Sequence, residues 1–195
     1  SIVAPKVDNA DSVAGLVASI RCKETERGLP GGAIGLIALI ESPRALEHIS
    51  RIADVPGVVG LALGVEDFTL ALGVEPGPEA LDLPCRMLAL TAAARGLASI
   101  GAPASIATFD PPSPYGAAAQ RAKAMGMTGV LCIHPAQVAE VNRTFAPSEA
   151  QLADALLIQK AWGSRPEGAA VVRIGDRMID APLAKRAERL LAGAR

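Results

Sequence analysis

The chain has 195 residues, half of them hydrophobic and only 3% aromatic, and its formal net charge is −1. This length is enough to bury the core of one domain, and a near-balanced charge without a basic tract argues against a nucleic-acid or anionic-membrane surface. The longest apolar run, around residues 33–40, is too short to cross a bilayer. The first residues also lack the pattern of a secretory leader, so we expect a cytoplasmic protein with no membrane partner.

Short aliphatic runs alternate with helical patterns along most of the chain. We expect five strands, at residues 2–6, 33–41, 58–63, 99–107 and 128–133. Strands that are buried on both faces have continuous runs of this kind, which predicts a parallel sheet covered by helices.

Local start signals predict where several helices begin. Asn9 or Asp8 can cap the first helix, and Ser42 can cap the second, with Pro43 at its first position. Further helices are expected over residues 79–95, around 120–123, and after a capping box formed by Ser148 and Gln151.

The end of the chain has a different pattern. Residues 169–179 predict a small hairpin, and Pro182 opens a final amphipathic helix. We therefore divide the chain into a β/α body, residues 1–163, and an extension, residues 164–195. The extension is expected to cover a site or to pack on a neighbouring subunit.

The alternation of strands and helices fits two α/β architectures. One is an open doubly wound sheet, and the other is part of a TIM (β/α)₈ barrel, which typically has about 250 residues. An open nucleotide-binding sheet would carry a glycine-rich phosphate loop after an early strand, but Gly31 and Gly32 precede a strand. The three cysteines, Cys22, Cys85 and Cys132, match neither a disulfide framework nor a zinc pattern.

Two acidic residues each follow an aliphatic run. Glu41 ends the run at 33–40, and Asp67 comes shortly after the run at 58–63. This spacing is that of one strand–helix–strand unit, so both carboxylates should emerge at the carboxyl edge of a parallel sheet. An all-oxygen pair there suits Mg²⁺. The competing interpretation is helix capping, which Ser42 weakens for Glu41 because it can cap that helix itself.

Further motifs occur in a fixed order. They are Pro5-Lys6-Val7, Ile40-Glu41, Gly64-Val65-Glu66-Asp67-Phe68, Ile133-His134-Pro135-Ala136-Gln137, Val141-Asn142-Arg143-Thr144-Phe145 and Gly175-Asp176-Arg177-Met178-Ile179-Asp180. Together they resemble the citrate lyase beta-subunit-like family of the HpcH/HpaI aldolase superfamily, which includes malyl-CoA and citramalyl-CoA lyases. The resemblance implies a TIM barrel from which the first three β/α units are missing, and with them an acidic loop and a substrate-binding arginine.

The resemblance also implies roles for the acidic residues. Glu41 and Asp67 would hold Mg²⁺, and Asp180 would reach a neighbouring subunit's site and transfer a proton at the acyl-CoA carbon. From its position alone, Asp180 could equally cap the helix that begins near Pro182.

The remaining candidate residues lie around the substrate. Backbone amides of the turn at Gly64, Val65 and Glu66 could bind a carboxylate, and strand alternation is expected to turn the Glu66 side chain away from Asp67. Lys6 could bind a CoA phosphate or simply be solvated.

Two further residues, His134 and Pro135, are placed at the rim of the site without a catalytic role, His134 with the alternative of shaping a turn. Asp110 is either close to the site or a turn residue. Arg44 departs from the small residues that relatives usually have at its position.

Taken with this resemblance, the residues predict a Mg²⁺-dependent carbon–carbon lyase. It would cleave a 3-hydroxyacyl-CoA into acetyl-CoA, or a related acyl-CoA, and a 2-oxo acid, or catalyse the reverse condensation. The expected partners are these small molecules and further copies of the chain, with a homotrimer or a multiple of it implied by the resemblance. The alternatives are a metal-dependent aldolase acting on free hydroxy-oxo acids and a non-catalytic homologue that binds acyl-CoA.

Overall fold

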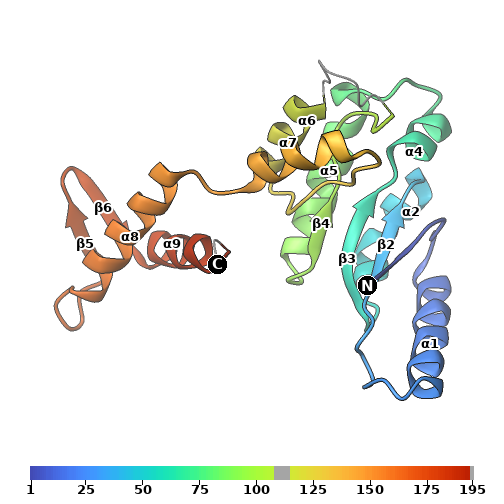
Figure 1. Cartoon of the computed structure of the whole chain (residues 1–195), viewed down its shortest axis with the longest axis horizontal. Coiled ribbons are helices and arrows are strands. Elements are labelled where there is room, and N and C mark those ends of the chain that lie inside the picture. The colour runs from blue at the N-terminus through green and yellow to red at the C-terminus, as the bar shows by residue number, and fades with distance from the viewer. Residues whose placement is uncertain (108–114, 194–195) are drawn as a thin grey trace. The chain divides into compact units, whose positions relative to one another are not determined.

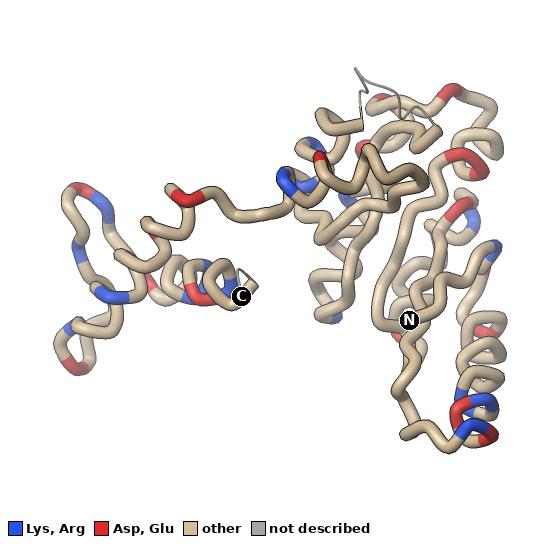
Figure 2. The backbone as a smooth tube through the Cα atoms, in the orientation of Figure 1, with Lys and Arg blue, Asp and Glu red and all other residues tan. Residues whose placement is uncertain are grey.

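The computed structural model describes residues 1–107 and 115–193 (Figure 1). The chain forms two compact units, Ser1–Phe145 and Ala146–Arg195. No helix in the described ranges is long and apolar enough to span a membrane. Lys and Arg are interspersed with Asp and Glu along both units (Figure 2), in line with the absence of a basic tract.

The first unit is built on a parallel sheet. Its strands are β1 (Ile2–Ala4), β2 (Leu36–Ile40), β3 (Val58–Leu63) and β4 (Ala98–Ile100), and they pair in the order β1-β2-β3-β4. The four strands thus lie in the sheet in the same order as in the sequence. The predicted α/β fold with a parallel sheet is confirmed.

Helices follow or connect these strands. They are α1 (Ala10–Glu26), α2 (Pro43–Glu47), α3 (Ile49–Ala53), α4 (Val65–Leu72), α5 (Pro78–Ala93), α6 (Tyr115–Ala124) and α7 (Pro135–Phe145). The predicted caps are present, because the side chains of Asn9 and Ser42 accept hydrogen bonds from the amides of Ser12 and Ala45. The helix after Ser42 breaks at His48 into α2 and α3.

The fifth predicted strand, at 128–133, is wrong. Only an isolated parallel bridge joins Ile100 to Gly129. Beyond it, side chains take over the role of a neighbouring strand, since the Tyr115 hydroxyl donates to the Leu131 carbonyl and the Gln137 side chain accepts from the Ile133 amide. These two backbone groups are therefore bonded by side chains and not by a neighbouring strand.

The predicted strand 99–107 also ends early, at Ile100. Gly101 follows with φ 155°, and a Cβ there would lie 2.9 Å from the Cβ of Leu63. Both the backbone angle and the crowding favour glycine at this position, directly after β4.

The sheet is covered by aliphatic helix faces. Leu36, Ala38 and Ile40 alternate inward along β2, and Leu81 and Leu88 of α5 are fully buried. The first unit thus has one continuous core beneath the carboxyl edge.

The second unit consists of α8 (Glu149–Gly163), an antiparallel hairpin of β5 (Val171–Ile174) and β6 (Arg177–Asp180), and α9 (Ala181–Gly193). The predicted hairpin, final helix and Ser148–Gln151 capping box are all present. The predicted division after residue 163 differs from the observed one after Phe145. The reason is that Ala155 and Ile158 of α8 pack with Ile179 and Ala187.

The three cysteines are free. Cys85 is buried, Cys132 is half-buried and Cys22 is exposed. Burial raises the pKa of Cys85 to about 12, so this thiol stays protonated and behaves as a core residue.

Candidate metal and substrate site

Glu41 lies directly after β2 and is only 9% exposed. Its Oε1 accepts a hydrogen bond of 2.5 Å from the backbone amide of Lys6, which follows the neighbouring strand β1. The carboxylate is therefore fixed by the adjacent strand end. Such a bond to the charged form orients the side chain and leaves Oε2 for another partner.

Asp67 reaches the same edge from the next strand. It belongs to the first turn of α4, which starts two residues after β3 ends. The Gly64 amide donates to the Ile40 carbonyl at 2.9 Å and holds the end of β3 against the end of β2. Glu41 and Asp67 consequently line the same two cavities, of about 230 and 320 Å³, as the spacing predicts.

Gly64 is required by the closeness of Glu41. A Cβ at position 64 would lie 2.6 Å from the Glu41 Cβ and 2.8 Å from its Oε2. Contacts this short would push Glu41 out of its position. Because the Gly64 amide already donates to Ile40, the amides that remain for a ligand are those of the first turn of α4, at Val65 and Glu66.

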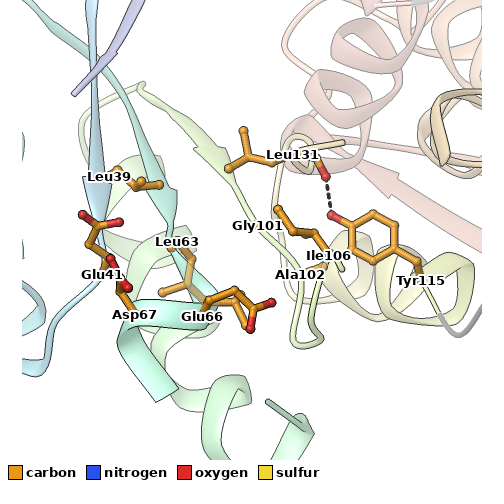
Figure 3. A pocket seen from close by; sticks show the side chains of 12 residues that line it. Leu39, Glu41, Leu63, Glu66, Asp67, Gly101, Ala102, Ile106, Tyr115 and Leu131 are labelled. Atoms are coloured by element: carbon orange, nitrogen blue, oxygen red, sulfur yellow. Dashed lines mark hydrogen bonds between the residues drawn. The ribbon is translucent and has the colours of Figure 1, made fainter. Parts of the chain in front are cut away.

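Glu66 also lines the smaller cavity, between the wall with Glu41 and Asp67 and the wall opposite them (Figure 3). The direction predicted for the Glu66 side chain assumed the alternation of a strand, and this assumption is wrong because residues 65–72 form a helix. Its Oε1 accepts a 2.6 Å hydrogen bond from the Ser105 hydroxyl, which joins α4 to the loop after β4. The carboxylates of Glu66 and Asp67 also interact favourably with the positive end of α4.

Figure 3 shows Glu41 and Asp67 on one side of this cavity and Tyr115 and Leu131 on the other. The far side is largely apolar and is completed by Ala102 and Ile106. Burial raises the pKa of Tyr115 above its usual range, so its hydroxyl stays a donor to Leu131. Sequence reasoning missed this wall. The signal was available, since Tyr115 is the one tyrosine of the chain and follows a proline-rich stretch of sequence.

A model of the HpcH/HpaI aldolase/citrate lyase family matches residues 1–135. The chain belongs to this family. The motif resemblance is thereby confirmed, and every residue that lines the two cavities described above lies within the matched range.

Individual members of the family are moderately similar in sequence. A citrate lyase subunit beta-like protein from Deinococcus radiodurans is 28% identical over 168 residues, which cover 86% of this chain and 58% of that protein. The chain spans about three fifths of the length of the first curated relatives that it matches.

Two solved family structures are similar to the chain. A citrate lyase from Burkholderia xenovorans has a TM-score of 0.82 and 26% identity, covering 99% of this chain and 62% of its own. CitE from Mycobacterium tuberculosis, in complex with magnesium, acetoacetate and coenzyme A, has a TM-score of 0.74 and 25% identity, covering 98% and 67%.

The donor set fits the magnesium of that family member. Glu41 and Asp67 provide only oxygen atoms, which a hard cation prefers, and the adjoining cavity of about 320 Å³ has room for waters and substrate oxygens. The described residues contain no group of three or more His, Cys, Asp or Glu side chains that could form a metal site by themselves. A cation here would therefore depend on two protein ligands and on oxygens supplied from outside.

His134 and Pro135 do not line either of these cavities. Pro135 is the first residue of α7. His134 Nδ1 accepts a 3.2 Å hydrogen bond from the Ala136 amide, as expected of a residue that shapes a turn. The buried Gln137, which sequence reasoning did not single out, accepts from the amides of Ile133 and His134. It also donates to the Ile106 carbonyl, so it supports the cavity wall from behind.

Asp180 is the last residue of β6, in the second unit. Its Oδ1 accepts a 3.0 Å hydrogen bond from the Leu183 amide and caps α9. Within its own chain, Asp180 therefore acts as the helix cap that its position predicts. Arg44 is exposed on α2, and Asp110 falls in residues 108–114, outside the described ranges.

Proposed function

We propose that this chain carries the magnesium-binding part of an acyl-CoA carbon–carbon lyase. The substrate would be a 3-hydroxyacyl-CoA of the citramalyl, malyl or citryl type, cleaved to an acyl-CoA and a 2-oxo acid or formed in reverse. The observation that supports this proposal is that Glu41 and Asp67 line the same two cavities. The wall of the smaller cavity that faces these two residues is largely apolar. The carboxylates suit a metal-bound oxo acid, and the apolar side suits the carbon chain next to it.

The chain's own residues would divide the work of cleavage. When bound, Mg²⁺ would supply Lewis-acid stabilisation of the substrate alkoxide and a template for the oxo acid. Glu41 and Asp67 would hold it, and the amides of Val65 and Glu66 at the start of α4 would bind the oxo-acid carboxylate.

The atoms balance in a single bond cleavage. The hydroxyl loses its proton to solvent, its oxygen forms the new carbonyl, and the C–C bonding pair leaves as the enolate of the acyl-CoA. Asp180 from a neighbouring subunit would then give a proton to the enolate carbon. In the condensation direction the same carboxylate would remove that proton.

The proposal includes a larger fold. Four parallel strands in sequential order are compatible with part of a TIM barrel whose first three β/α units lie outside this sequence. In support, Ile2 and Val3 of the edge strand are 47% and 43% exposed. An apolar cavity of about 270 Å³ lies beside them, lined by Leu16 and Ile20 of α1. A further β/α unit would cover this edge.

We also propose a homo-oligomer, a trimer or a multiple of it. Residues 164–195 would pack on the neighbour and present Asp180 to its site. Lys6, His134 and Pro135 would lie around the bound thioester, with Lys6 contributing the positive charge on the side of the carboxylates.

The direct test is a cleavage assay with and without Mg²⁺. It uses this chain together with any coding sequence that precedes Ser1, and citramalyl-CoA, malyl-CoA and citryl-CoA as substrates. We expect metal-dependent release of an acyl-CoA from one of them. Glu41→Gln and Asp67→Asn should each lower the rate by about 100-fold or more, since loss of mere outer-shell partners already costs about 10- to 100-fold.

Glu47→Gln is the matched control, because Glu47 is exposed on α2 and lines neither cavity. It should leave the rate unchanged. Cleavage that persists in EDTA, or in the Glu41 variant, would contradict the metal assignment. Activity on the free acid in place of the thioester would favour the aldolase alternative, and binding of acyl-CoA without turnover would favour the non-catalytic one.

A further inference from the structure

Lys6 has an unusual backbone conformation. Its φ is 53°, and it is the one non-glycine residue with a positive φ in the described part of the chain. A side chain at such an angle is strained, and strain of this kind persists where the surrounding structure enforces it. Here the conformation directs the Lys6 amide at Glu41 Oε1, at 2.5 Å.

The Lys6 side chain reaches the other carboxylate. Its Nζ lies 3.5 Å from Asp67 Oδ2, and the two side chains are 80% and 48% exposed. An ion pair as exposed as this is weak and readily exchanged. One residue thus contacts both members of the acidic pair, Glu41 through a fixed backbone amide and Asp67 through a mobile ammonium group.

The contact between Lys6 and Asp67 lies in surroundings that are otherwise negatively charged. The two cavities are lined by four carboxylates, those of Asp8, Glu41, Glu66 and Asp67. Lys6 is the only lysine or arginine among the described residues that line them. Asp8 accepts a hydrogen bond from Ser42, and Glu66 accepts one from Ser105, but neither hydroxyl carries charge.

We propose that the Lys6 ammonium is a built-in counter-ion that a divalent cation must displace. In the metal-free protein it offsets the repulsion between Glu41 and Asp67. When the cation binds, the ammonium group moves away from Asp67, while the amide of Lys6 continues to orient Glu41. Lys6 is thus a positioning residue that sets metal affinity, an inference that rests on the proposed function of the pair as metal ligands.

The alternative is that Lys6 binds a phosphate of CoA and has no effect on the metal. The geometry favours the counter-ion, because the ammonium group is already drawn toward the carboxylates. The two roles differ in a measurement that needs no thioester, namely the affinity of the protein for Mg²⁺ alone.

The experiment is calorimetric titration of the chain with Mg²⁺. Lys6→Met keeps most of the length of the side chain and keeps the backbone strain, but it removes the charge. We expect its Mg²⁺ affinity to rise about threefold to tenfold, the effect of one unit charge on a divalent cation across about 5 Å of water at physiological salt. The difference from wild type should shrink as salt is added.

Three further variants make the result specific. Lys6→Arg should retain wild-type affinity, and Lys6→Gly should gain affinity as Lys6→Met does while relieving the strain at φ 53°. Lys23→Met changes the net charge equally on α1, where Lys23 pairs with Glu26, and should have no effect.

Two negative outcomes can be told apart. If the wild type binds Mg²⁺ and Lys6→Met binds it equally or more weakly, the counter-ion role is overturned while the metal site stands. If the folded wild type binds no Mg²⁺, the proposed metal site fails and this inference fails with it.

Discussion

The two units of the molecule place their acidic residues by different means. In the first unit, Glu41 and Asp67 are far apart in sequence and meet because parallel strands end at one edge. In the second unit, Asp180 ends an antiparallel strand and bonds to Leu183, three residues away. Parallel topology gathers distant residues into a cavity, whereas a hairpin followed by a helix gathers neighbours. A catalytic role for Asp180 therefore needs a surface that its own unit does not provide.

The units also differ in how much they bury. The first has an extended core on both sides of β3. In the second, the buried cluster comprises Ala155, Ile158, Ile179 and Ala187. A small core makes each large side chain carry a greater share of the stability. The stability of the second unit should thus depend on few residues, which can be tested.

The largest effect on stability is expected for Ile179→Ala. Ile179 is fully buried between the hairpin and the helices of the second unit. Loss of a buried isoleucine side chain typically costs about 2–5 kcal/mol of unfolding free energy. In native-state hydrogen exchange, amides in residues 146–193 should lose protection, and those of β2 and β3 should keep it.

Met178→Ala on the same strand is the control for Ile179. Met178 is 68% exposed, and its replacement should change stability by no more than about 0.5 kcal/mol. Equal loss of protection in both units after Ile179→Ala would show that the two do not unfold separately.

The next effect concerns pH and the first unit. Glu24 is fully buried on α1, where both its oxygens accept from Arg21 and also from the amides of Gly32 and Ile34. The Arg21 guanidinium and these amides lower the pKa of Glu24 to about 2. Because the folded pKa is depressed, its stabilisation is complete above the ordinary value near 4.5 and is lost as pH falls toward 2.

Urea unfolding from pH 6 down to about pH 2.5 measures this contribution. The wild type should lose more stability across the range than Glu24→Gln, which has no charge to protonate. Glu26→Gln, at an exposed position paired with Lys23, should follow the wild-type pH dependence. Parallel curves for wild type and Glu24→Gln would contradict the assignment.

Local signals in the sequence were enough to predict much of the fold. The caps at Asn9 and Ser42 and the capping box at Ser148 depend on residues within one turn, and these are present in the structure. The placement of Glu41 and Asp67 required only strand order and the length of a strand–helix–strand unit. Such features follow from short-range chemistry and parallel topology.

Other parts of the site depend on contacts that no short segment encodes. The aliphatic run at 128–133 predicts a strand, but Tyr115 and Gln137 from two helices bond its backbone and hold it as the cavity wall. The left-handed conformation of Lys6 is likewise imposed by Glu41, since lysine has no intrinsic preference for it. Tertiary hydrogen bonds override local propensity at these positions, and both positions lie at the candidate site.

The smallest expected effect on stability is at Asp180, and it decides whether the second unit also serves catalysis. Asp180→Ala removes the α9 cap and should cost about 1 kcal/mol, whereas Asp180→Asn keeps a capping oxygen and should cost little. If Asp180 only caps, Asp180→Asn should retain cleavage activity. If it also transfers a proton, Asp180→Asn should lose activity while remaining as stable as the wild type.

A mixing experiment then tests whether Asp180 acts in the site of a neighbour. Glu41→Gln and Asp180→Asn are each expected to be inactive, and they are co-expressed in equal amounts. In a closed ring with random mixing, about a quarter of shared sites combine an intact Glu41 with an intact Asp180 from the next subunit, so about a quarter of wild-type activity should return. A site completed within one chain would regain none, because every chain then carries one defect. Recovery would make the second unit part of another copy's site, and its absence would place the action of Asp180 within its own chain.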